Sequence, residues 1–167
     1  MRASGQKALW EIVVGAREGV LATIGRDGRP HLSNVYYVPD DGPGDGPRTI
    51  RICTTAGRAK GRNLLRDPRA VLHVPGPDFF NFAVVEGTVS LGPATAPGEP
   101  AIDELHAVNT VFNGEAERPT FDHRMIRDRR MVVRIRVTNL YGLVHGSVRR
   151  RDTPETSAGQ ADLGRQR

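Results

Sequence analysis

Short runs of alternating apolar and polar residues recur along the chain. This pattern is typical of strands, whose successive side chains face opposite sides of a sheet. Six runs predict strands, over Gly19–Gly25, Pro30–Val38, Arg48–Cys53, Ala70–Val74, Phe79–Leu91 and Met131–Val144. In the last run Val133 and Ile135 alternate with Arg134 and Arg136. We therefore expect one face of that strand to be buried and the other to meet water or a partner.

Apolar residues at helical spacing interrupt the strands in a few places. Leu9, Trp10 and Val13 predict an amphipathic helix over Gln6–Arg17. Further helices are expected over Gly98–Phe112, around Asp122–Arg127, and in a short segment that ends at Asp67-Pro68.

The turns favour an antiparallel arrangement. Asp27-Gly28 stands between the first two apolar runs and predicts a two-residue hairpin with a type I′ turn. Pro39–Pro47 is expected to be a flexible acidic loop. No G-x-G-x-x-G follows a predicted strand, which disfavours a Rossmann fold. We therefore predict a mainly β protein, an antiparallel β-barrel with peripheral helices.

Length and composition suit one domain. Residues 1–146 of the 167 are predicted to form it, and residues 147–167, Arg-rich and almost without apolar residues, are predicted to be a disordered tail. No apolar run is long enough for a membrane span, and Met1–Lys7 lacks the apolar centre of a signal peptide. We expect a cytoplasmic protein that does not enter a membrane.

The net charge of +5 raises the question of nucleic-acid binding. The cations are spread along the chain, and a compact cluster occurs only at Arg149–Arg151. Nucleic acid is therefore an unlikely partner. Lys7 and Lys60 are the only lysines in a chain rich in arginine. A lysine at position 60, inside the predicted domain, is therefore unusual for this composition.

Lys60 belongs to a junction between a predicted strand and a predicted helix. Thr54 and Thr55 precede that helix and are expected to cap its free N–H groups. Arg58, Lys60 and Arg62 add positive charge to a helix N-terminus, which itself favours anions. One interpretation is a cradle for a phosphate-bearing cofactor. The other is an ordinary basic surface helix.

Other candidate residues have two interpretations each. Cys53, the only cysteine, is expected to be a small buried hydrophobe rather than a reactive thiol, and His73 a structural histidine rather than a catalyst. Ser33 and Asn34 are either a satisfied polar pair at a barrel rim or a hydrogen-bonding lip for a ring system. The aromatic residues at Phe79–Phe82 are either core or an apolar wall for a flat ring.

Four motifs, in this order, resemble the pyridoxamine 5′-phosphate oxidase-like split β-barrel superfamily. They are Gly19–Ile24 with Asp27–Pro30, Ser33–Val35 and Tyr37; Gly57–Leu64 with Arg66–Arg69; Val84–Thr88; and Asp128–Arg130 with Tyr141-Gly142. Their order and spacing are similar to the actinobacterial branch that uses the deazaflavin coenzyme F420. The resemblance covers roughly Gly19 to Gly146.

The resemblance implies a homodimer with the cofactor in a groove between two split barrels. It implies that Arg58, Ala59, Lys60 and Asn63 hold the cofactor phosphate, and that Ser33, Asn34, Cys53, Thr54 and Thr55 line its ring and ribityl chain. It also implies that Phe80, Asn81, Phe82, Ala83 and Asn139 belong to the same groove, from either subunit. Relatives often carry Trp at the position of Phe80 and Ser at that of Cys53.

The expected function is hydride transfer between coenzyme F420 and a small conjugated substrate. Such chemistry belongs to the cofactor and needs no protein nucleophile. A proton donor could be Tyr37, His31 or water. The alternatives are an FMN-dependent oxidase or reductase of the same fold, a cofactor-binding protein without turnover, and a nucleic-acid binder that acts through the Arg-rich tail.

Overall fold

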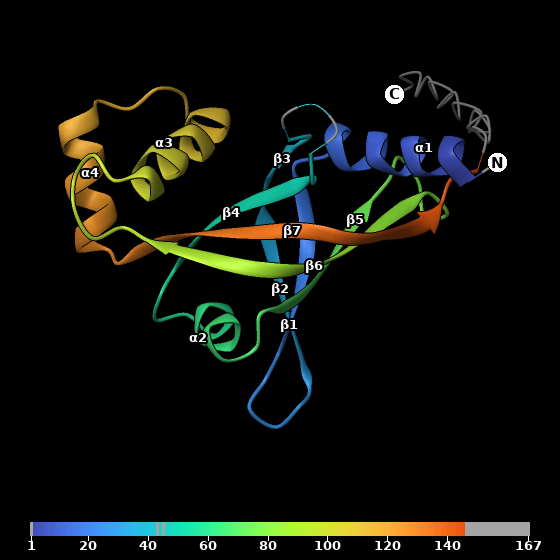
Figure 1. Cartoon of the computed structure of the whole chain (residues 1–167), viewed down its shortest axis with the longest axis horizontal. Coiled ribbons are helices and arrows are strands. Elements are labelled where there is room, and N and C mark those ends of the chain that lie inside the picture. Colours follow the sequence, from blue (N-terminus) through green and yellow to red (C-terminus); the bar gives the residue numbers. More distant parts are fainter. Residues whose placement is uncertain (1, 43, 45, 146–167) are drawn as a thin grey trace, which may run out of the picture.

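The computed structural model describes residues 2–42, 44 and 46–145, so the predicted tail at 147–167 lies outside the described residues. Seven strands and four helices make up the described part (Figure 1). In chain order they are α1 (Arg2–Gly15), β1 (Glu18–Ile24), β2 (Pro30–Tyr36), β3 (Val38–Asp40), β4 (Thr49–Thr55), α2 (Ala59–Arg66), β5 (Arg69–Pro75), β6 (Phe82–Pro93), α3 (Pro100–Asn113), α4 (Arg118–Arg127) and β7 (Arg130–Leu143).

The strands form one antiparallel sheet in the order β2-β1-β5-β6-β7-β4-β3. The long pair β6–β7 crosses the middle of the molecule, and the sheet curls around it into a half-barrel (Figure 1). A register shift between Glu86 and Gly87 interrupts this pair. A Cβ at Gly87 would lie 2.4 Å from the carbonyl oxygen of Arg136, so only glycine fits this close approach. The mainly β, split-barrel prediction is confirmed.

The concave side of the sheet holds the main core. Leu21, Leu72, Val85 and Ile135 from four different strands are completely buried there. The amphipathic helix α1 packs across β5, β6 and β7 and adds Trp10 and Val13 to the same cluster. The predicted period-2 pattern therefore identifies the buried face correctly.

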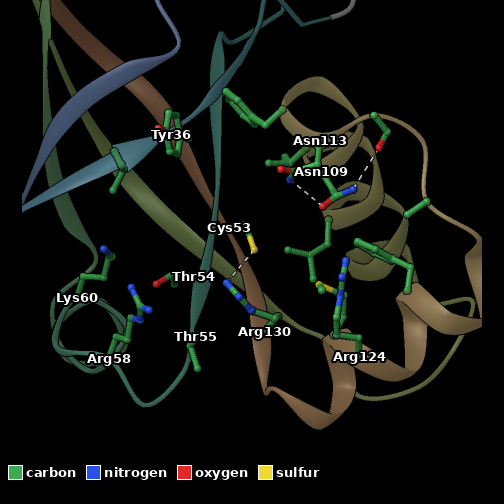
Figure 2. Close-up of a pocket in the computed structure, with 18 of the residues that line it drawn as sticks. Tyr36, Cys53, Thr54, Thr55, Arg58, Lys60, Asn109, Asn113, Arg124 and Arg130 are labelled. Carbon is green, nitrogen blue, oxygen red and sulfur yellow. Dashed lines mark hydrogen bonds between the residues drawn. The ribbon is translucent and has the colours of Figure 1, made fainter.

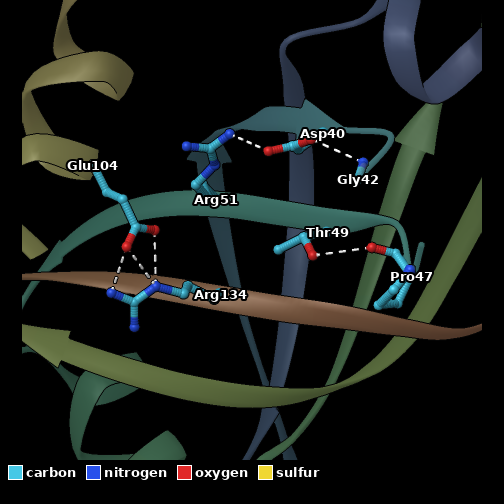
Figure 3. A network of polar contacts seen from close by, with 7 residues as sticks. All are labelled: Asp40, Gly42, Pro47, Thr49, Arg51, Glu104 and Arg134. Carbon is cyan, nitrogen blue, oxygen red and sulfur yellow. Dashed lines mark hydrogen bonds and ion pairs between the residues drawn. The ribbon is translucent and has the colours of Figure 1, made fainter. Parts of the chain in front are cut away.

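A second, smaller core joins α3 and α4 to the other side of the sheet. Ile102 and Leu105 of α3, with Phe121 and Met125 of α4, pack around Val132 of β7. Arg134 of β7 adds a forked ion pair, in which its Nε and Nη2 donate to the Glu104 carboxylate at 2.7–2.9 Å (Figure 3). The helical pair is thus fixed to one end of β7 by apolar and ionic contacts together.

The structure corrects the predicted hairpin turn and the predicted start of the strand before Leu91. The turn after β1 is not type I′, because Gly28 has a positive φ of 80° but Asp27 does not. The Gly28 N–H donates to the Gly25 carbonyl at 3.0 Å, which makes a longer turn. β6 begins at Phe82, so Phe79 and Phe80 lie in the preceding turn, where the Asp78 side chain accepts backbone N–H groups.

The predicted loop over residues 39–47 contains part of a strand. β3 pairs with β4, and an ion pair between Arg51 and Asp40 joins them (Figure 3). The short run Val38–Asp40 carries an acid and a proline, so its pattern alone does not predict a strand. Among the described residues, no helix is long and apolar enough to cross a membrane.

Candidate functional site

A groove of about 960 Å³ lies between the sheet and the α3–α4 pair. Figure 2 shows side chains that point into it from both walls. One wall carries Asn34 and Tyr36 of β2, the end of β4, and the first turn of α2. The other wall carries α3, α4 and Arg130, the first residue of β7. The groove therefore lies where the predicted basic junction meets the helical pair.

The basic junction differs from the prediction in how its helix begins. Thr54 and Thr55 are the last residues of β4 and do not cap α2. Arg58 takes the N-cap position with extended backbone and makes no side-chain cap. The first N–H groups of a helix have no intrahelical partner. In α2 these donors therefore lie beside the groove without the threonine caps that the sequence suggested.

Close packing fixes the position of α2. A Cβ at Gly61 would lie 3.0 Å from the carbonyl oxygens of both Thr55 and Ala56, so glycine lets the helix lie directly on the end of β4. Asn63, which is buried, donates from Nδ2 to Thr23 Oγ1 of β1 at 3.1 Å. The amide of Asn63 thus joins α2 to the barrel.

Two cations from this junction line the groove, Arg58 and Lys60. Partial burial lowers the pKa of Lys60, and the neighbouring Arg58 guanidinium lowers it further. Both causes disfavour the charged ammonium. A bound anion would remove this penalty, because it would neutralise the pair.

The opposite wall supplies Arg124 of α4 and Arg130 of β7. A tight turn aims Arg130: Arg129 has a positive φ of 51°, and its carbonyl accepts the Ala56 N–H at 3.0 Å. Arg130 Nη1 lies 3.8 Å from Cys53 Sγ. Burial raises the pKa of the Cys53 thiol, and the Arg130 guanidinium offsets part of that rise. Cys53 is thus a partly buried thiol, and its raised pKa disfavours the thiolate form.

Two buried polar atoms of the groove lack hydrogen-bond partners among the described residues. They are Thr54 Oγ1 and Arg130 Nε. Thr54 is only 3% exposed. Unpaired buried donors are rare in folded proteins, because each one loses its water without a replacement. These two atoms belong to residues on either side of Cys53. A ligand in the groove would supply the hydrogen bonds that they lack.

The charge in the groove is strongly one-sided. Arg58, Lys60, Arg124 and Arg130 face a single lining carboxylate, that of Glu115. None of these four cations forms an ion pair with the residues at 2–42, 44 and 46–145. A concave site with unpaired cations attracts anions.

The structure brings together six of the residues that the sequence nominated. Asn34, Cys53, Thr54, Thr55, Arg58 and Lys60 all line the groove. Ala59 stands between the two cations of α2, whereas Ser33 Oγ lies 3.4 Å from His31 Nδ1 on the exposed hairpin. Asn63 bonds within the barrel, as described above.

The other nominated residues lie at the far end of the long strands. Phe82 pairs with Leu143 and Ala83 with Gly142, while Asn139 Nδ2 donates to the Glu86 carboxylate at 3.0 Å. Asn139 lies nine positions after Arg130 in β7, which corresponds to roughly 30 Å of strand. Asn81 holds the turn before β6, and Phe80 is 61% exposed. This second set cannot share one groove with Arg130 within a single chain.

The sequence interpretation missed the α3–α4 wall. Arg124 and Arg130 were not nominated, nor were Asn109 and Asn113, whose amides are hydrogen-bonded to each other at 3.0 Å. The available signal was Asp128-Arg129-Arg130, which contributed to the family resemblance without a role.

The structure also bears on the proton-donor candidates. Tyr37 is fully buried and its hydroxyl donates to the Val13 carbonyl at 2.7 Å. Burial raises the pKa of Tyr37 well above its ordinary value. The Tyr37 side chain therefore belongs to the core. His31 is exposed on β2 and does not line the groove.

Comparison with known proteins gives the family. Residues 6–142 match the pyridoxamine 5′-phosphate oxidase family. The chain belongs to this family. A conserved hypothetical protein from Mycobacterium tuberculosis has a similar structure, with 30% identity, a TM-score of 0.59, and coverage of 83% of this chain and 88% of that one.

More distantly related proteins with this fold have names that report different cofactors. A protein described as an F420 reductase is 23% identical, with a TM-score of 0.58 over 78% of this chain and 94% of its own. The heme storage protein HutZ from Vibrio cholerae is 15% identical, with a TM-score of 0.61 over 85% and 96%. At these identities the likeness concerns the fold, and a fold alone does not define a cofactor.

Proposed function

We propose that this protein is an oxidoreductase that binds the deazaflavin coenzyme F420 in the groove and exchanges a hydride between it and a small conjugated substrate. The observation that supports this most is the buried Thr54 Oγ1, which has no hydrogen-bond partner among the described residues and lies at a groove lined by four cations without ion pairs in that part of the chain. The F420 reductase among the structural relatives agrees with this choice.

The residues present fit a cofactor with a phosphate and a polar ring system. Arg58, Lys60 and the first-turn N–H groups of α2 would hold the phosphodiester, as cations and a helix N-terminus commonly do. Thr54 and Asn34 would bond polar ring and ribityl atoms. Coenzyme F420 is polyanionic, which suits the positive groove better than a neutral flavin does.

The protein's own contribution would be binding, orientation and exclusion of water. When bound, the deazaflavin supplies the carbon that accepts or releases the hydride. The apolar side chains of Val108, Phe121 and Met125 would keep water from that region. With Tyr37 in the core and His31 outside the groove, we propose water as the proton source for reduction of a double bond.

FMN is the second candidate cofactor, because the phosphate end of the groove does not distinguish the two molecules. Family membership favours this possibility directly, since the family takes its name from an oxidase of that cofactor class. An FMN-dependent oxidase or reductase, or a cofactor-binding protein without turnover, would use the same Arg58–Lys60 end.

We further propose a homodimer, since proteins of this fold are commonly dimeric. Phe79, Phe80, Tyr141 and Leu143 are 40–90% exposed near the second set of nominated residues. That set, with Phe82 and Asn139, could reach a groove only on a second copy of the chain. Light scattering coupled to gel filtration would test this: a monomer at micromolar concentration contradicts it.

Paired lysine variants test the cofactor site. Lys60→Ala should weaken binding of both coenzyme F420 and FMN, measured by fluorescence titration, by about 1–3 kcal/mol, the range for a lost charge-assisted hydrogen bond. Lys7→Ala, at an exposed position on α1, is the matched control and should have no effect. Equal affinities for the two variants and the original protein would remove Lys60 from the site.

Turnover is a separate question from binding. Reduced coenzyme F420 should be reoxidised by the protein in the presence of a panel of conjugated ketones, aldehydes and acids, followed by the return of deazaflavin absorbance. Tight binding without turnover on such a panel would favour the non-catalytic alternative.

A further inference from the structure

The α3–α4 wall gives the groove a second basic end, distinct from the Arg58–Lys60 end. In Figure 2 Arg58 and Lys60 lie on one side of β4 and Arg124 and Arg130 on the other, with Cys53 of β4 between them; all five line the groove. We propose that the Arg124–Arg130 end binds the carboxylate of an organic-acid substrate. This inference deepens the proposed function and rests on it for the identity of the reaction.

Arg130 is held ready for a ligand by its backbone and neighbours. Its turn is fixed by the left-handed Arg129 and by the hydrogen bond from the Ala56 N–H. Its Nη1 reaches only the weak acceptor Cys53 Sγ, at 3.8 Å, and its buried Nε has no partner among the described residues. A guanidinium with such free donors matches the two oxygens of a carboxylate.

The nearby acids leave this end positive. Asp128 lies close to Arg124 and Arg130, but its Oδ1 already accepts from Arg127 Nε at 2.9 Å. Among the described residues, Glu115 is the one carboxylate that lines the groove, and it is exposed. Two arginines therefore face one solvated acid, and an incoming carboxylate would be attracted.

The remaining side chains of the α3–α4 wall indicate what the rest of the organic acid, apart from its carboxylate, is like. Phe121 and Met125 of α4 with Leu105 and Val108 of α3 form an apolar surface beside the two arginines. Arg124 itself lies 5.5 Å from the centre of the Phe121 ring, which orients its guanidinium. A flat or unsaturated apolar body with one carboxylate fits these contacts.

Coenzyme F420 also carries carboxylates, in its glutamate tail. In the covalent order of that molecule the tail follows the phosphodiester, on the side away from the ring. In our proposal the phosphodiester lies at Arg58 and Lys60, and the ring rather than the tail is taken to lie on the Arg130 side of it. We therefore assign the carboxylate at Arg130 to the substrate.

The test uses two probes of closely similar shape, cinnamate and cinnamamide, of which the second lacks the charge and has a donor NH2 group in place of one acceptor oxygen. Binding of each to the full chain without cofactor is measured by chemical-shift titration, since millimolar affinities are accessible to that method. The original protein should prefer cinnamate by about tenfold, which corresponds to one charge-assisted hydrogen bond. Arg130→Gln should abolish the preference, Arg130→Lys should restore part of it, and Arg124→Gln should reduce it.

The controls separate this inference from the proposed function. Arg26→Gln, in the exposed turn between β1 and β2 and outside the groove lining, should keep the preference, as should Lys60→Ala. Arg130→Gln should bind coenzyme F420 and FMN with an unchanged ratio of affinities. A selective loss of F420 affinity would instead assign the carboxylate to the tail, and would overturn the substrate assignment.

Equal binding of the two probes, or no binding of either, would also overturn the inference. An unchanged preference in Arg130→Gln would do the same, provided that its thermal unfolding matches that of the original protein. If the probe preference holds but neither cofactor binds, the carboxylate site stands and the proposed function fails.

Discussion

Thr54→Val distinguishes a hydroxyl that binds a ligand from one that stabilises the fold, because the two roles predict opposite changes in the stability of the free protein. Thr54 is 3% exposed, and its Oγ1 has no partner among the described residues. Leaving a buried hydroxyl unpaired costs roughly 1–3 kcal/mol. Valine keeps the β-branched shape that suits a strand and removes the unpaired group. The free protein should therefore gain about 1 kcal/mol of stability, or about 2–4 °C in Tm.

Ligand binding should change in the other direction. If a cofactor atom bonds to Thr54 Oγ1, the valine variant loses one neutral hydrogen bond, which contributes about 0.5–1.5 kcal/mol. The dissociation constants for coenzyme F420 and FMN should then rise roughly twofold to tenfold. A protein that evolved for stability alone would have no reason to keep the unpaired hydroxyl.

Thermal unfolding and fluorescence titration of one protein preparation measure both effects. Thr49→Val is the matched control, since Thr49 lies on the same strand but outside the groove, with its hydroxyl 3.5 Å from the Pro47 carbonyl (Figure 3). The control should leave cofactor affinity unchanged. A Thr54→Val protein that loses stability and keeps full affinity would refute the reasoning, because the hydroxyl would then have a structural partner.

Three further outcomes are expected. The affinity of the groove for FMN should fall as the pH rises through the pKa of Lys60, which burial and Arg58 hold below the ordinary lysine value. In the ligand-free protein, the free energy of unfolding should rise with pH between this lowered pKa and the ordinary lysine pKa of the unfolded chain, when compared with Lys60→Ala. Asn63→Ala should lower the free energy of unfolding by about 1–3 kcal/mol, since it removes the buried donor to Thr23 Oγ1 and leaves that hydroxyl only its long bond to the His31 carbonyl at 3.5 Å; an unchanged melting curve would contradict that role. Gly61→Ala should weaken cofactor binding, because its Cβ would press on two carbonyl oxygens 3.0 Å away and push α2 from the sheet; unaltered affinity would show that the helix can shift without cost.

Local sequence patterns predicted the fold because apolar and polar residues alternate within each strand that has a buried face. Val133 and Ile135 are buried while Arg136 is exposed, as the sequence of β7 alone indicated. Turn geometry was harder, since Asp27-Gly28 is compatible with several turns and only the backbone bond from Gly28 to Gly25 decides among them. The start of β6 was misplaced because Phe79 and Phe80 have strand propensity but are held in a turn by Asp78.

Some residues of the candidate site could likewise be predicted from the local sequence, and others could not. Arg58 and Lys60 could be nominated because a local junction of strand and helix brings them together. Arg124 and Arg130 could not, because their position depends on how α3 and α4 pack against β7, a contact between distant segments. The capping role expected of Thr54 failed for a related reason, since β4 continues two residues farther than its apolar run.

The most direct test of the cofactor assignment is a parallel fluorescence titration of the purified protein with coenzyme F420 and with FMN. We expect saturable binding of coenzyme F420 that is clearly tighter than that of FMN, and we expect Lys60→Ala to bind both molecules more weakly. Tighter binding of FMN would keep the groove and move the function to flavin chemistry. Binding of neither molecule would contradict the central claim, and would leave the Arg58–Lys60 junction as a basic helix end without a cofactor.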